Sequence, residues 1–127
     1  MNQITLPNSP NERGGLQPLV ELTANGTTRA EVGVNQPVTL AARMTMPPRA
    51  GQIVHYAWYL GTPDYKFEPA VSLPKPKLTF DVNRTVSFAT PGDYSITLRA
   101  EGERNSISNT KGTTYLQNVA RVRVVVR

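Results

Sequence analysis

The sequence contains no cysteine, which excludes a disulfide framework, a thiolate metal site and a cysteine nucleophile. It also lacks any run of about 20 apolar residues that would span a bilayer, so we expect no membrane insertion. Residues 1–7 have neither the basic start nor the apolar centre of a signal peptide. Any export signal would therefore lie outside this chain, and an extracellular or periplasmic location depends on a longer parent protein.

Acidic residues are fewer than basic ones, nine against 14, which gives a formal net charge of +5. A positive charge can attract an anionic partner such as nucleic acid. The lysines and arginines, however, occur singly rather than in dense clusters, as is typical of an ordinary solvated surface. We therefore expect no specific binding of nucleic acid.

Helix-like periodicity is scarce, whereas eleven prolines and nine glycines separate short segments in which apolar and polar residues alternate. Alternation is typical of a half-buried strand, because successive side chains point to opposite faces of a sheet. The clearest example begins after the Pro91-Gly92 turn and places Tyr94, Ile96 and Leu98 on one face. The same pattern predicts strands at residues 18–24, 28–34, 38–46, 53–60, 78–82, 85–89 and 118–127, and a short edge strand at 65–71.

The strand at 53–60 contains the only tryptophan. Its alternation predicts that Val54, Tyr56, Trp58 and Leu60 face the core and that His55, Ala57 and Tyr59 face outward. We expect Trp58 to be buried at the centre of the core, with a partner for its indole N–H.

Several segments lack this alternation. Residues 1–17 are predicted to be a linker or disordered tail that precedes a single domain at 18–127. Residues 73–77 are rich in proline and basic, Asn83-Arg84 is predicted to form a turn, and 101–117 reads as a long polar loop of the kind that is often functional or disordered.

Two segments resemble the signatures of the polycystic kidney disease (PKD) domain family. Residues 53–61, with Trp58, are similar to the tryptophan strand of that family. Residues 86–98 resemble its second signature, in which a short aromatic strand is followed by Pro91-Gly92 and a strand that begins with Tyr94. The resemblance covers residues 18–127 and implies an all-β fold, an immunoglobulin-like antiparallel β-sandwich with Greek-key connections and about seven to nine strands.

The resemblance also implies a non-catalytic spacer, docking or adhesion module. Such modules are often extracellular and attached to a hydrolase, and a chain that closes on a strand fits the carboxyl-terminal domain of a larger bacterial hydrolase-like protein. The sequence departs from the family where Tyr59 replaces an aspartate and where residues 61–64 replace an acidic glycine turn. We therefore do not expect this chain to bind calcium as some members of the family do.

Catalytic and metal-binding motifs are scarce. His55 is the one candidate general base, but its phase places it on an outer sheet face with no neighbouring nucleophile, so we expect no enzyme. The carboxylates that could bind Ca²⁺ are dispersed without EF-hand spacing, and we interpret them as surface acids and expect no cofactor. They are Asp64, Asp81, Asp93, Glu101 and Glu103.

Outward-facing residues of three strands predict a docking face for an upstream domain, another protein or a second copy, because Arg and Tyr are enriched at interfaces. We define the docking face as His55, Tyr59, Arg99, Arg121 and Arg123. The alternative is an ordinary polar sheet face.

A second candidate function is binding of a carbohydrate or another polymer by exposed rings. The candidate stacking residues are Tyr59, Tyr65, Phe67 and Tyr115, although some of these rings could instead close one end of the core. Tyr94, near the start of its strand, is the candidate for a tyrosine corner.

Overall fold

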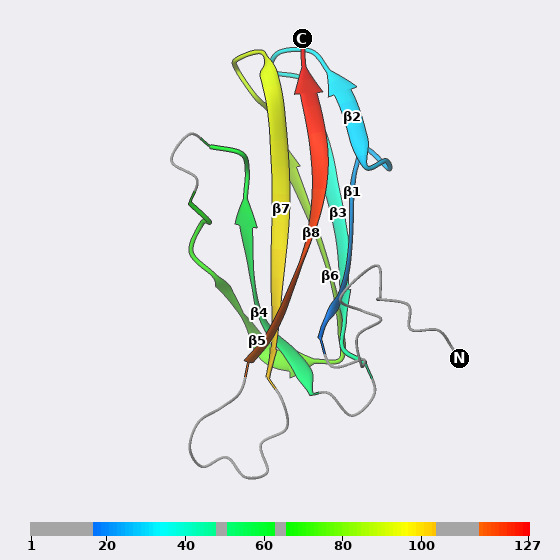
Figure 1. Ribbon diagram of the computed structural model, residues 1–127, viewed down its shortest axis with the longest axis vertical. Coiled ribbons are helices and arrows are strands. Elements are labelled where there is room, and N and C mark those ends of the chain that lie inside the picture. The colour runs from blue at the N-terminus through cyan, green and yellow to red at the C-terminus, as the bar shows by residue number, and fades with distance from the viewer. Residues whose placement is uncertain (1–16, 48–50, 63–65, 104–114) are drawn as a thin grey trace, which may run out of the picture.

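The computed structural model describes residues 17–47, 51–62, 66–103 and 115–127, apart from the side chain of Tyr115 (Figure 1). Every regular element in this part of the chain is a strand. The strands are β1 (Leu19–Ala24), β2 (Arg29–Val32), β3 (Val38–Thr45), β4 (Gln52–Tyr59), β5 (Val71–Lys77), β6 (Thr79–Val86), β7 (Gly92–Glu103) and β8 (Tyr115–Val126).

The strands form two sheets that pack face to face. One sheet has the order β1-β3-β6 and the other the order β2-β8-β7-β4-β5. The chain crosses between the sheets after β1, β2, β3, β5 and β6, which confirms the all-β, immunoglobulin-like sandwich. In Figure 1, β7 and β8 run along most of the length of the molecule.

One strand pair departs from the expected antiparallel arrangement, because β2 runs parallel to β8. The chain leaves the smaller sheet at the turn formed by Asn25 and Gly26, which have φ angles of 50° and 82°. Positive φ angles suit Asn and Gly in a tight turn. After this turn, β2 joins the edge of the larger sheet, which is therefore mixed.

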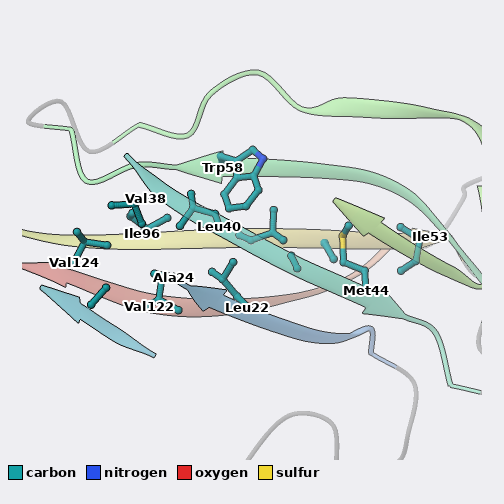
Figure 2. Close-up of a cluster of buried hydrophobic side chains, with 14 of the residues drawn as sticks. Leu22, Ala24, Val38, Leu40, Met44, Ile53, Trp58, Ile96, Val122 and Val124 are labelled. Carbon is teal, nitrogen blue, oxygen red and sulfur yellow. The ribbon is translucent and has the colours of Figure 1, made fainter. Parts of the chain in front are cut away.

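The core lies between the two sheets. It is built from the residues of each strand that face the opposite sheet. Trp58 is only 3% exposed and belongs to the same buried cluster as Leu40, Ile96 and Val122 (Figure 2). Its burial follows the inward phase that the sequence predicts. The indole N–H, however, has no hydrogen-bond partner among the described residues; the guanidinium of Arg84 lies 5.9 Å from the ring centre instead.

A register shift between Ile53 and His55 alters the predicted phase at the start of β4. Ile53, rather than Val54, joins the core cluster, although both side chains are buried. Such a bulge adds one residue to one strand and so reverses the alternation across it. Beyond the bulge, Tyr56 and Trp58 contact the core as predicted.

The segment between β4 and β6 differs most from the sequence prediction. Residues 66–70 form no strand, whereas the proline-rich residues 71–77 form the edge strand β5. Prolines are tolerated there because an edge strand has one side without ladder hydrogen bonds. Leu78, predicted to face inward, is 58% exposed because it joins β5 to β6 where the chain changes sheets.

The predicted turn at Asn83-Arg84 is wrong. Strand β6 continues through both residues, which pair with Ala41 and Leu40 of β3. Alternation of half-buried and exposed positions persists along the strand and places Arg84 in phase with Phe80. The predicted strand therefore ended too early because the polar residues Asn83 and Arg84 were interpreted as a turn.

The long polar loop predicted at residues 101–117 is partly strand. β7 extends to Glu103 and β8 begins at Tyr115, and residues 101–103 pair with residues 115–117. Gly102 is buried, and a side chain at this position would collide with Met46 of the core. The rest of the predicted loop, residues 104–114, lies outside the described residues. Residues 1–16 of the predicted tail also lie outside them.

Tyr94 forms the predicted tyrosine corner. Its hydroxyl donates a hydrogen bond of 2.7 Å to the backbone carbonyl of Thr90, across the Pro91-Gly92 turn. Its ring stacks on Phe88 with 4.0 Å between ring centroids. This pair of contacts holds the start of β7 against the segment that precedes it.

We predict that Tyr94→Phe lowers the free energy of unfolding by about 1 kcal/mol, because it removes this hydrogen bond and leaves the stacked ring. Urea denaturation of the two proteins would measure the change. The control is Tyr59→Phe, whose hydroxyl makes a longer, exposed hydrogen bond of 3.2 Å to Thr62 and should matter less. Equal stability of Tyr94→Phe and the parent protein would contradict the prediction.

Candidate docking face of the five-stranded sheet

The docking face lies on three adjacent strands in the order β4-β7-β8. The strand register places Arg99 opposite Ala57, and Thr97 between Tyr59 and Arg121. These positions alternate with core residues, so their side chains share the outer face of the sheet. The structure thus brings the five residues of the docking face onto one surface.

Arg123 is neutralised by a neighbouring acid. Its guanidinium binds both carboxylate oxygens of Asp93 on β7, with 2.8 Å between Nε and Oδ1. This hydrogen bonding, together with the charge of Arg123, lowers the pKa of the Asp93 carboxyl below its usual value. At the edge of the sheet, Glu31 is held in the same way between Arg29 and Arg127, at 2.7 and 3.2 Å, and its pKa is also lowered.

His55 is held by an acid of the next strand. Its Nδ1 lies 3.1 Å from Oε1 of Glu101, and the amide of Gln117 donates to the other oxygen of Glu101. The register also places Ser72 of β5 opposite His55, a neighbour that the sequence did not reveal because β5 was not recognised. No hydrogen bond joins Ser72 to His55 in the described part of the chain, so Ser72, His55 and Glu101 do not meet the geometric requirements of a catalytic triad.

Arg99 and Arg121 differ from the other cations of this face. Arg99 lies over the ring of Phe67, 4.5 Å from its centroid, and its buried Nε has no hydrogen-bond partner among the described residues. Arg121 donates from Nε to the hydroxyl of the buried Thr97 at 3.3 Å. Neither arginine forms an ion pair within residues 17–47, 51–62, 66–103 and 115–127.

A shallow groove lies beside Arg121 over β7 and β8. Its lining residues are Thr28, Asp93, Ser95, Arg121, Val122 and Arg123. Asp93 and Arg123 neutralise each other, so Arg121 is the unpaired charge of the groove. Sequence patterning predicted the outward residues but not this groove, which depends on how β2 approaches β8.

The candidate stacking rings are engaged with the protein itself. Tyr59 and Phe67 are half-buried against each other, with ring centroids 5.9 Å apart, and Arg99 covers one side of Phe67. Tyr65 and the side chain of Tyr115 lie outside the described residues. The described rings therefore do not form an open platform.

The segment that contains Phe67 also forms a backbone hydrogen bond with β4. The backbone N–H of Glu68 donates to the carbonyl of Trp58 at 2.8 Å. The carboxylate of Glu68 binds both terminal nitrogens of Arg84, whose guanidinium lies beside the Trp58 ring. The sequence did not predict this role of Arg84, because Arg84 was placed in a turn. The spacing of two residues from Val82 and from Val86 was the signal that Arg84 continues the inward face of the strand.

The acids considered for calcium are spread over both sheets. Asp81 binds Arg43 on the smaller sheet, Asp93 binds Arg123 on the larger one, and Glu101 contacts His55 and Gln117. Glu103 lies at the end of β7, and Asp64 is outside the described residues. Where the structure describes the chain, no three His, Asp or Glu residues converge on a point that could hold a metal ion.

The described residues contain no helix that is long and apolar enough to cross a membrane.

Comparison with known proteins gives one family. The model of the PKD domain matches residues 21–114. No curated protein matches the chain significantly.

We predict that Glu68→Gln lowers stability at pH 7 and that the difference from the parent protein shrinks on acidification. The hydrogen bonds from Arg84 lower the folded-state pKa of Glu68 below its ordinary value of 4.5. The ionised carboxylate therefore stabilises the fold above pH 4.5, and this contribution is lost as the pH falls through the folded-state pKa.

Urea midpoints of both proteins between pH 7 and pH 3 would measure this effect. Arg84→Gln removes the other half of the pair and should show the same convergence with the parent protein. A stability difference that stays constant over this range would contradict the role assigned to the pair.

Proposed function

The chain belongs to the PKD domain family, and from this premise we propose that it is a non-catalytic accessory module that docks onto another protein surface through the docking face. Domains of this family are immunoglobulin-like modules generally used for accessory or interaction roles. The partner would be an upstream domain of the same polypeptide or a separate protein. A larger bacterial hydrolase-like parent protein, outside the cytoplasm, is part of the same proposal.

The observation that supports this proposal is the contrast between the two outer faces of the sandwich. On the smaller sheet, Arg43 is paired with Asp81 beside small residues such as Ala41 and Thr23. On the larger sheet, Arg99 and Arg121 lie near Tyr59 without a neutralising acid among the described residues. Arginine and tyrosine are among the side chains that are enriched at interfaces and at their binding hot spots.

We favour docking over binding of a carbohydrate. Sugar stacking needs an exposed ring face, and the described rings of this region, Tyr59 and Phe67, contact each other and Arg99.

A photoreactive phenylalanine analogue placed at Ser95 tests the proposal in the full polypeptide in its native host. Ser95 is exposed on the outer face of the larger sheet, and Asn83, exposed on the smaller sheet, is the matched control position. We predict that light produces a defined protein cross-link from position 95 and none from position 83, with the attached peptide identified by mass spectrometry. Equal cross-linking from both positions, or none from position 95, would contradict a docking role for this face.

A further inference from the structure

We propose that Arg99 and Arg121 recognise two carboxylates of an extended acidic protein segment. This inference rests on the docking function and adds the chemistry of the partner. It follows from the charges that remain unpaired, from the spacing of the two arginines and from the way each is held.

Three acids of this face are already engaged by other groups. Asp93 binds Arg123, Glu31 binds Arg29 and Arg127, and Glu101 contacts His55 and Gln117. Arg99 and Arg121 form no ion pair with any described residue. An external anion that binds both arginines would neutralise two charges that no described acid balances.

The spacing of the two arginines suits an extended chain. Arg121 lies opposite Thr97, and Arg99 is two residues further along the same face of β7, so the arginines are diagonal neighbours. Diagonal positions of an antiparallel pair lie about 7–8 Å apart. Alternate residues of an extended peptide lie about 6.6–6.8 Å apart on one side, so Glu-x-Glu presents its carboxylates at a similar spacing.

The side chains of Arg99 and Arg121 are restricted by contacts within the domain before any partner binds. Phe67 lies against the guanidinium of Arg99, and the Thr97 hydroxyl accepts a hydrogen bond from Arg121. Cation–π contact and hydrogen bonding restrict long side chains and so reduce the entropy lost on binding. The groove next to Arg121 adds the hydroxyl groups of Thr28 and Ser95, which can bond to a peptide backbone.

Binding of a short peptide by NMR tests the inference. The probe is the peptide Gly-Glu-Ser-Glu-Gly with blocked ends, and the control probe has both glutamates replaced by glutamine. Titration of the ¹⁵N-labelled chain at low salt should shift the amide signals of residues 95–99 and 119–123 in a saturable way. The glutamine peptide should cause no shifts.

Substitutions on this face and on the opposite sheet distinguish specific recognition of the peptide from attraction by the net charge of the protein. Arg99→Gln and Arg121→Gln should each weaken binding about two- to fivefold, the range for exposed ion pairs. Arg43→Gln changes the net charge by the same amount on the smaller sheet and should leave the affinity unchanged. Arg121 is exposed, so Arg121→Gln remains a valid test even if Arg99→Gln disturbs packing against Phe67.

Besides an absence of peptide binding, two results would overturn the inference. The first is an equal loss of affinity in Arg43→Gln, or shifts scattered over all basic residues, which would indicate unspecific attraction. The second is tighter binding of tetragalacturonate than of the glutamate peptide at the same residues, which would indicate an acidic polysaccharide. A cross-link from position 95 without peptide binding would retain docking and reject the acidic partner, whereas peptide binding without that cross-link would reject docking and retain the recognition chemistry.

Discussion

The antiparallel pairing of β7 with β8 is the interaction on which the rest of the structure depends. Its register runs without interruption from Gly92 opposite Val126 to Glu103 opposite Tyr115. The inner face of this pair supplies the core with residues such as Ile96, Leu98, Val122 and Val124, while the outer face carries three of the five docking residues. Because alternate residues of the same two strands serve both purposes, burial of the core fixes the spacing of the arginines that we propose to bind a partner.

Three of the four edge strands of the sandwich are protected from unwanted pairing by different means. β5 contains two prolines, and β2 is only four residues long. β6 carries an inward-pointing charge, Arg84, which is stabilised by Glu68 next to Trp58. Prolines, short edge strands and inward charges all hinder the addition of a further strand. These features are consistent with an interaction through a sheet face rather than through a sheet edge.

The sequence predicted the fold class, most strands and the outward phase of the docking face, because alternation along β3, β7 and β8 is clear. It failed where alternation and local composition disagree. The prolines of β5 and the Asn83-Arg84 pair of β6 are turn-like by themselves, yet edge and tertiary context permit a strand. The bulge after Ile53 and the contact of Phe67 with Arg99 could not be predicted, since neither a register shift nor a non-periodic segment leaves a regular pattern in the sequence.

Amide hydrogen exchange under native conditions tests the central role of the β7–β8 pair most directly. If this pairing supports the sandwich, the central amides of both strands, around Ile96 to Leu98 and Ala120 to Val122, exchange only through global unfolding and are the slowest in the protein. Their exchange free energies should equal the free energy of unfolding from denaturant titration. Slower exchange in β1 and β3, or exchange of β7 and β8 through local opening, would contradict the account.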